Sequence, residues 1–486
     1  MDILNQIIEK LNKEEARNLK LFYGNQAYTG RKDLVLFNYI RNSGNNFKEE
    51  KALKKLHYQN SKNSYYRLKN RLIEDIGDSL LLLHTHKSEQ LELFQFIELY
   101  QFYRSRNQYK VCLFYLRKAE RLALAIENYE LLDIVYSGLI KLSAELADVE
   151  PVNYIKKRES NLLILASLRE LDDILAILAH RLKISQNFGE LDRSMLRKLQ
   201  LKVEEITKRT TSGYGRNLSS RIYNALSQVF LQQHNYVALE KLVKDNYRSF
   251  ERNKWFDKSN HEQKLQMLTY AGNALFKNHK NKESLEYSVM LGNEIEQYGK
   301  SHYEKYLFFY YNLQVLNYAV LDPPKGLQAL DQFEREMRKK ENTYYDFFIY
   351  LNRAALLYDL GKYNQALKNL VRLYVSDGYL KADAAFKLRI EVSELIITFE
   401  SGEMDTLLYR VEQVRKSFGK LLEKKEFKRD REVIQLIKDM QATPNYLRDE
   451  KIQKRIKAIL KEKYSPVEED VEVIKYRTWL NQKLRK

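Results

Sequence analysis

Apolar residues recur along most of the chain at positions i, i+3 or i+4, and i+7. One such stripe consists of Tyr363, Ala366, Leu367, Leu370, Leu373 and Tyr374. This spacing places the apolar side chains on one face of a helix with 3.6 residues per turn. The pattern therefore predicts a long chain that is all-α.

Two predicted helices meet at Gly361. An apolar helix runs from Leu351 to this glycine, and Tyr363 begins the striped helix after it. Gly361 is suited to end the first helix because glycine enters the left-handed conformation without a penalty from Cβ. The small side chain of Ala366 allows the two helices to approach closely. The segment therefore predicts an antiparallel helical hairpin.

Four positions of this hairpin hold a small residue, a glycine, an aromatic residue and an alanine. These are Ala354, Gly361, Tyr363 and Ala366. In this pattern the segment resembles the tetratricopeptide (TPR) repeat. The resemblance covers roughly residues 91–420 and is most specific around 350–374. It implies a TPR-like, right-handed superhelical solenoid of antiparallel helix hairpins.

Weaker relatives of the hairpin recur, and turn signals mark their positions. The signals lie at positions 107, 148, 189, 234, 279, 322, 361 and 402. Seven intervals separate the first from the last, so the mean interval is about 42 residues, within the range of HEAT and armadillo repeats. One hairpin cannot cover its own apolar face, so stacked neighbours would bury a continuous core. We therefore expect one array of repeats over residues 91–440.

Residues 1–90 are predicted to form an N-terminal helical cap, because the end of a solenoid must present a polar outer face. The expected helices are 2–11, 13–23, 32–42, 47–59 and 62–84. Asn12 is a candidate N-cap for the second of them.

The last two of these helices also have the arrangement of a helix-turn-helix. A turn at Gln59–Lys62 would separate a helix ending near Leu56 from one beginning at Asn63. Five polar residues would then be available to contact phosphates or bases: Lys62, Asn63, Arg67, Lys69 and Arg71. Any two short helices joined by a polar turn give this pattern, so a plain helical cap is the competing interpretation.

Residues 441–486 are predicted to form a basic C-terminal helical cap. Its apolar stripe consists of Ile452, Ile456, Ile459 and Leu460. A basic amphipathic helix suits an anionic membrane or an acidic partner, but this stripe has no Trp or Phe anchor, which favours docking onto the repeats. Ser465–Pro466 would start a final helix, which Trp479 and Leu480 would pack onto the last repeat.

Glycine and proline are scarce, with 16 Gly and 5 Pro in 486 residues. All-β folds need many tight turns, and linkers or low-complexity segments are rich in these residues. The composition argues against all three. Length alone would suggest about three domains, whereas the repeat spacing favours one solenoid with caps.

The chain is basic, with 83 Lys and Arg against 65 Asp and Glu and a net charge of +18. Nucleic acid, anionic lipid or an acidic protein could be attracted to it. Solvated helix faces are the competing explanation because charges of both signs are mixed along the chain.

The location expected from the sequence is cytoplasmic. Cys112 is the only cysteine, so no intrachain disulfide is possible, and its packing position indicates a buried thiol. No stretch approaches the length of a membrane span, and the N-terminus lacks the apolar region of a signal peptide.

No motif of a nucleotide-binding loop, zinc protease, serine hydrolase or calcium loop occurs in the sequence. We expect no catalytic residues, no metal site and no cofactor, and therefore not an enzyme.

The preferred hypothesis is a non-enzymatic scaffold or adaptor that binds a protein or peptide. The TPR resemblance implies a groove formed by the first helix of each hairpin, where Asn273 and Lys277 are candidates to hold a peptide carboxylate. The alternative is a nucleic-acid-binding regulator whose N-terminal helix-turn-helix is controlled by the repeats. The sequence leaves the partner and the oligomeric state open.

Overall fold

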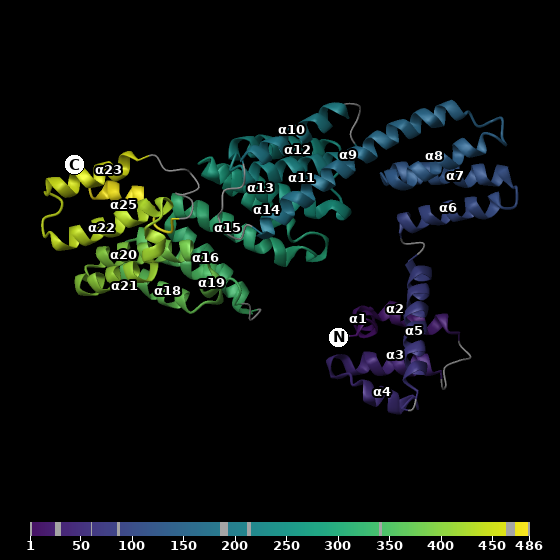
Figure 1. Ribbon diagram of the computed structural model, residues 1–486, viewed down its shortest axis with the longest axis horizontal. Coiled ribbons are helices and arrows are strands. Elements are labelled where there is room, and N and C mark those ends of the chain that lie inside the picture. Colours follow the sequence, from purple (N-terminus) through teal and green to yellow (C-terminus); the bar gives the residue numbers. More distant parts are fainter. Residues whose placement is uncertain are drawn as a thin grey trace. The chain divides into compact units, whose positions relative to one another are not determined.

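The helical spacing of the apolar residues is realised throughout the computed structural model of the chain (Figure 1). The structure describes residues 2–24, 31–59, 61–84, 88–184, 193–210, 215–339, 343–462 and 472–484. No strand occurs in these ranges, and consecutive helices pack in pairs, so the all-α prediction is confirmed. Contacts divide the chain into two units, Met1–Arg169 and Glu170–Lys486. Their boundary lies inside the segment predicted as one array.

The first five helices form a bundle around a core of their own. They are α1 (Ile3–Lys10), α2 (Lys13–Phe22), α3 (Lys32–Ser43), α4 (Glu49–Lys55) and α5 (Lys62–His84), with a 3-10 turn η1 (Gly44–Asn46). The predicted bounds of α1, α2, α3 and α5 agree with these to within one residue, whereas α4 begins two residues later and ends four residues earlier than the predicted 47–59. The core buries large side chains of α1, α3 and α5, among them Leu4, Phe37 and Leu72.

Local capping explains where α2 begins. The side chain of Asn12 accepts a hydrogen bond of 2.9 Å from the backbone N–H of Glu15. The Glu15 carboxylate accepts one of 2.8 Å from the backbone N–H of Asn12 in return. This reciprocal pair is a capping box, and it satisfies N–H groups that a helix start otherwise leaves without a partner. The prediction of Asn12 as N-cap is confirmed.

A second core lies among the next helices of the first unit. These are α6 (Glu89–Arg104), α7 (Tyr109–Ala125) and α8 (Tyr129–Leu142), which pack side by side (Figure 1). Cys112 is fully buried in this core, as expected, and burial raises the pKa of its thiol. A Cβ on Gly138 would lie 3.1 Å from the Leu116 side chain, so the glycine lets α8 lie close against α7.

Helix α9 (Pro151–Ile184) differs from the prediction. A pair of helices was expected between the turns near 148 and 189, but a single helix of 34 residues runs on from Pro151. The segment contains no glycine and no further proline, so nothing in the sequence stops the helix. The expected turn at Asn187–Gly189 lies outside the described residues. The regular alternation of helix pairs is therefore interrupted at α9.

Helix pairs occupy the first two thirds of the second unit. The helices are α10 (Arg193–Arg209), α11 (Arg216–Gln232), α12 (Tyr236–Arg252), α13 (His261–Lys277), α14 (Asn281–Glu294), α15 (Tyr303–Leu321), α16 (Pro323–Lys339), α17 (Asp346–Asp359) and α18 (Tyr363–Tyr374), with 3-10 turns η2 (Lys258–Asn260) and η3 (Tyr298–Lys300). From α11 onward one continuous apolar core runs through these pairs and into the C-terminal helices.

Left-handed residues make five of the predicted turns. They are Asn107, His234, His279, Gly361 and Gly402, each with positive φ. After such a residue the chain can return hydrogen bonds to the helix end, as the N–H of Lys362 does to the carbonyl of Leu357 at 2.8 Å. Asn and His tolerate this conformation better than most residues with a Cβ.

The remaining helices follow the α17–α18 pair, and the first two of them pack onto it. They are α19 (Asp377–Lys381), α20 (Ala384–Ser401), α21 (Met404–Leu422), α22 (Lys428–Ala442), α23 (Glu450–Lys461) and α25 (Tyr476–Gln482), with a 3-10 turn η4 (Lys425–Phe427). The predicted burial of Ile452, Ile456 and Ile459 is confirmed. Trp479 is also buried, and its Nε1 donates a 2.6 Å hydrogen bond to Glu400 of α20. The helix start predicted at Ser465–Pro466 lies outside the described residues.

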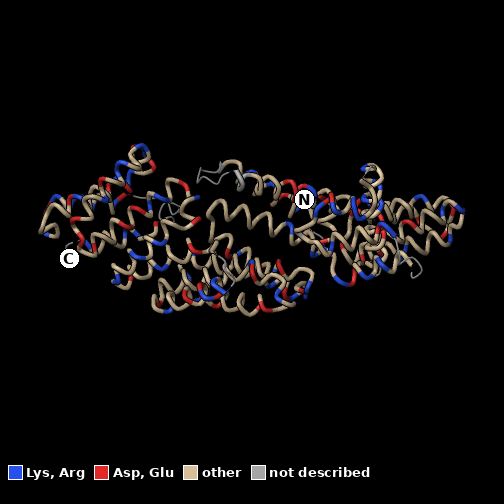
Figure 2. Tube along the Cα trace, turned by 90° about the horizontal axis from the view of Figure 1, so that it is seen from below, with Lys and Arg blue, Asp and Glu red and all other residues tan. Residues whose placement is uncertain are grey.

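Opposite charges are interspersed along the helices of each unit (Figure 2). This mixing is what solvated helix faces require. In the described part of the chain, no helix combines the length and the apolar character needed to cross a bilayer.

Candidate functional site

A pocket lies between α6 and α8, the helices that precede and follow α7 in the chain. Its volume is about 590 Å³. Helix α6 and the residue after it contribute Tyr100, Gln101, Arg104 and Ser105, and α8 contributes Asp133, Ile134, Ser137, Gly138 and Lys141. The lining is thus made of hydroxyl, amide and charged groups with one exposed aliphatic side chain, Ile134.

The pocket carries more positive than negative charge. Arg104 and Lys141 line it with one acidic residue, Asp133. Arg104 is held by a 3.1 Å hydrogen bond from its Nη1 to the Tyr100 hydroxyl. A third cation, Arg158 of α9, donates a 3.5 Å hydrogen bond to the hydroxyl of Ser137. Such a set of donors suits a ligand rich in acceptors, such as a carboxylate.

The groove residues predicted from the sequence lie elsewhere, on α13 of the second unit. Asn273 is half-buried, and the Lys277 ammonium lies 5.8 Å from the ring centre of Tyr236. Thr269, one turn earlier, is buried, and its hydroxyl donates to the carbonyl of Leu265. The structure therefore places Asn273 and Lys277 one turn apart on one helix, with the Lys277 ammonium near an aromatic ring.

The residues that carry the TPR resemblance hold the α17–α18 hairpin together. Ala354 and Ala366 are fully buried. Tyr363 is half-buried, with its ring centre 5.7 Å from that of Tyr358. Gly361 has φ of 70° at the turn. Their role is packing.

The five candidate nucleic-acid contacts divide into two groups. Lys62, Asn63 and Arg67 are exposed at the start of α5. Lys69 is 8% exposed and forms an ion pair with Asp2. Arg71 forms an ion pair of 2.7 Å with the buried carboxylate of Asp33. The last two cations are therefore engaged within the bundle.

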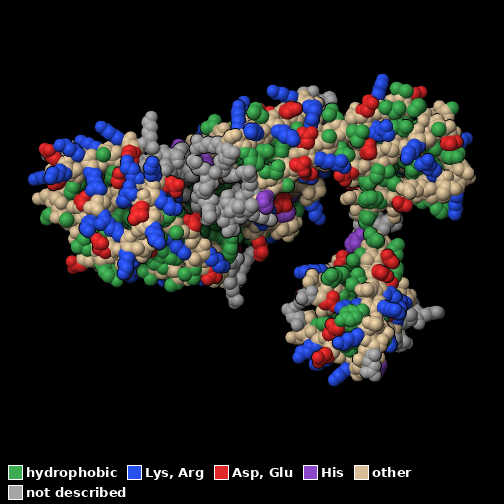
Figure 3. Space-filling model, in the orientation of Figure 1, with side chains coloured by type: hydrophobic (Ala, Val, Ile, Leu, Met, Phe, Trp, Pro, Cys, Tyr) green, Lys and Arg blue, Asp and Glu red, His purple; other side chains and the backbone are tan. Residues whose placement is uncertain are grey.

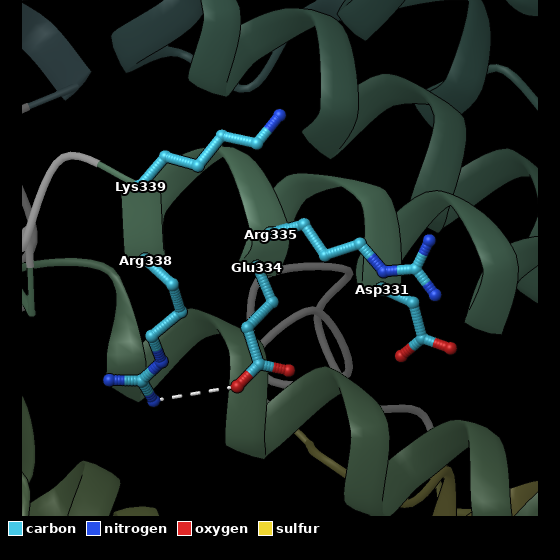
Figure 4. A pocket seen from close by; sticks show the side chains of 5 residues that line it. All are labelled: Asp331, Glu334, Arg335, Arg338 and Lys339. Carbon is cyan, nitrogen blue, oxygen red and sulfur yellow. Dashed lines mark hydrogen bonds and ion pairs between the residues drawn. The ribbon is translucent and has the colours of Figure 1, made fainter.

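A depression on α16 carries only charged residues, which Figure 4 shows. They are Asp331, Glu334, Arg335, Arg338 and Lys339. Arg338 lies 3.4 Å from Glu334, and Arg353 of α17 lies 2.6 Å from Asp331. The acids of this depression are therefore already paired, and the ion pairs of Arg353 connect α16 to α17.

The sequence did not reveal a cluster of two carboxylates on α20. Arg410 of α21 forms ion pairs with both Glu391, at 2.7 Å, and Glu394. The Tyr379 hydroxyl donates a 3.0 Å hydrogen bond to Glu391. Burial, together with the charge of Glu394, raises the pKa of Glu391. The guanidinium occupies the space between the acids, so the cluster is a closed contact between α20 and α21.

His261 is a further buried titratable group that the sequence analysis did not single out. It is 3% exposed, its Nε2 lies 3.6 Å from Glu294, and its ring packs against Tyr298. Burial lowers the pKa of the imidazole, since it disfavours the charged form. Within the described residues no group of three or more His, Cys, Asp or Glu could hold a metal ion.

The fold is that of an all-α protein of packed helix pairs. Its pocket lies between α6 and α8 and is lined by more cations than acids. No known protein family, curated protein or solved structure matches the chain.

Proposed function

We propose that the protein is a non-enzymatic, cytoplasmic scaffold or adaptor whose helical array binds a protein or peptide. In this proposal the helix pairs form a TPR-like, right-handed solenoid with a period of about 42 residues. The pairwise packing of consecutive helices and the left-handed turn residues at Asn107, His234, His279, Gly361 and Gly402 support it.

The observation that carries the proposal is the pocket between α6 and α8. Arg104 and Lys141 place two cations around it, and the hydroxyl of Ser137 adds a further donor. Backbone carbonyls and carboxylates of a peptide are the acceptors that such groups bind. The preferred ligand is therefore an acidic peptide segment of a partner protein. Asn273 and Lys277 remain candidates for a second contact along the array.

The test is selection of a random displayed peptide library on the full-length chain at low salt. Peptides with Asp or Glu are expected to be enriched. Lys141→Glu should weaken their binding about tenfold or more, because it replaces an attractive charge with a repulsive one in the pocket.

Lys110→Glu is the matched control. Lys110 is exposed on α7 and does not line the pocket, so the same charge change there should leave binding nearly unaltered. An absence of enriched peptides, or equal losses in the two variants, would contradict the proposal.

A further inference from the structure

A basic surface covers the end of α4 and the start of α5. Residues 51–73 contain seven Lys and Arg and no Asp or Glu. Two of these cations, Lys69 and Arg71, form ion pairs with Asp2 and Asp33 inside the bundle. The other five are exposed and form no ion pair within the described residues: Lys51, Lys54, Lys55, Lys62 and Arg67.

The exposed side chains of the first three turns of α5 form one stripe. It consists of Lys62, Asn63, Tyr66, Arg67 and Asn70, and the Tyr66 side chain is 48% exposed. The opposite side of these turns, with Tyr65, Leu68 and Leu72, is buried in the bundle core. The buried side therefore fixes the orientation of a stripe that offers cations, amides and an aromatic ring to solvent.

The charge of α5 reverses after the third turn. Glu74 and Asp78 are exposed there, and Asp75 accepts a 2.6 Å hydrogen bond from the Tyr23 hydroxyl. On α4 the two acids Glu49 and Glu50 lie in the first turn, away from the junction with α5. A polyanion would thus be attracted to the α4–α5 junction and repelled on either side of it.

We propose that this surface, the α4–α5 face, binds double-stranded DNA, with the first turns of α5 in the major groove and α4 over the phosphates. The major groove of B-form DNA, about 12 Å wide, admits an α-helix, whereas that of an RNA duplex is too narrow. Lys and Arg bind the phosphates, and Asn63, Arg67 and Asn70 can donate to base edges.

A membrane surface is the poorer match. Among the described residues of 49–73, Tyr66 is the only large apolar side chain that is exposed, so apolar anchors are lacking there. Figure 3 shows that Lys and Arg side chains are also exposed over the C-terminal helices. Charge alone is therefore not what distinguishes the α4–α5 face, and the C-terminal surface supplies a control.

The experiment measures binding of the full-length chain to a fluorescent DNA duplex of about 30 base pairs at several KCl concentrations. The test variant is Lys54→Gln, Lys62→Gln and Arg67→Gln. It should lower the affinity at low salt about tenfold or more and reduce the slope of log K against log salt by about three. The control variant is Lys451→Gln, Lys454→Gln and Lys457→Gln, which removes the same charge from the exposed side of α23.

The control variant should bind DNA as the unaltered chain does. Circular dichroism should be equal for all three proteins, because the substituted side chains are exposed. Three results would overturn the proposal: no DNA binding at about 50 mM KCl, equal losses in both variants, or tighter binding to an RNA duplex, to phosphatidylglycerol vesicles or to polyglutamate. The peptide pocket lies on other helices, so this outcome is independent of the proposed function.

Discussion

Glu240 illustrates how a single buried side chain joins two helix pairs. Its carboxylate accepts hydrogen bonds from Lys244 at 2.9 Å, Lys280 at 2.8 Å and Asn278 at 2.7 Å. Lys244 lies on the same helix, α12, whereas the other two donors belong to the turn between α13 and α14. The carboxylate therefore connects the α11–α12 pair to the α13–α14 pair.

This contact predicts a specific dependence of stability on pH. Burial alone would raise the pKa of Glu240, but the three hydrogen bonds lower it to about 2 from an ordinary value of 4.5. Because the pKa is lower in the folded chain, the carboxylate stabilises the fold above about pH 4.5, and this contribution is lost as the pH falls toward 2. Glu240→Gln should lower the free energy of unfolding by about 1–3 kcal/mol at pH 7 and by much less near pH 3.

Urea denaturation at several pH values checks this prediction. The control is Glu283→Gln, which removes an acid that also lies 2.9 Å from Lys244 but is 48% exposed. Its cost should stay below about 1 kcal/mol. A loss in Glu240→Gln that is the same at pH 7 and pH 3 would be inconsistent with the assigned role.

Substituting alanine at two glycines is expected to change the stability of the fold in opposite directions. A Cβ on Gly378 of α19 would lie 2.5 Å from the Cβ of Phe347 on α17, whereas one on Gly419 of α21 would meet nothing within 4 Å. Gly378→Ala should therefore lower the free energy of unfolding by about 1–3 kcal/mol. Gly419→Ala should raise it by about 0.5–1 kcal/mol, because alanine favours the helix. The two urea midpoints should move in opposite directions, and a shift in the same direction would refute the packing described for α19.

The ion-pair partners of charged side chains could not be predicted from the sequence. Lys69 and Arg71 stand out in the sequence as cations, but their partners Asp2 and Asp33 lie 67 and 38 residues away along the chain. Only the folded bundle brings the acids to them. The burial of apolar residues is easier to predict, because the burial of Ile452 or Cys112 follows from the local spacing of apolar positions.

At the scale of elements, helix limits were predictable where a cap or an apolar stripe is local. The bounds of α5 follow from the stripe that Tyr65, Leu68 and Leu72 begin, and the start of α2 follows from Asn12. The length of α9 was missed because a regular spacing was extended over a segment without a helix-breaking residue. The pocket was missed as well, because Arg104 and Lys141 meet only when α6 and α8 pack together.

The docking of α25 onto α20 gives a prediction at this scale. Trp479 is 1% exposed, donates to Glu400 and packs edge-on against Phe399. Trp479→Ala should lower the free energy of unfolding by about 3–5 kcal/mol, since it leaves a cavity. Trp479→Phe keeps most of the buried ring and loses the hydrogen bond, so it should cost about 1–2 kcal/mol. Equal effects of the two substitutions on urea denaturation, followed by circular dichroism, would show that α25 does not dock through this side chain.

At the scale of the whole molecule, the chain contains separate apolar cores, and the first of them is complete within α1–α5. A fragment of residues 1–84 contains all of this core and the Asp33–Arg71 ion pair. It should therefore be helical by circular dichroism and unfold cooperatively on heating. A fragment without a cooperative transition would mean that the bundle depends on the rest of the chain.

The composition and the spacing of apolar residues determine the helical class of the molecule, but its charge of +18 does not by itself identify a partner. The structure shows which cations are exposed, among them those at the α6–α8 pocket and at the α4–α5 face. The two surfaces are proposed to bind different partners, the pocket an acidic peptide and the α4–α5 face DNA.

Photo-crosslinking determines whether the pocket between α6 and α8 binds an acidic peptide. A selected peptide with a photoreactive group is irradiated on the full-length chain, and the modified residues are mapped by mass spectrometry. We expect adducts on α6 and α8 at residues lining the pocket, such as Gln101 and Ile134, and their loss in Lys141→Glu. Adducts confined to other helices, or undiminished in that variant, would contradict the proposed binding at this pocket.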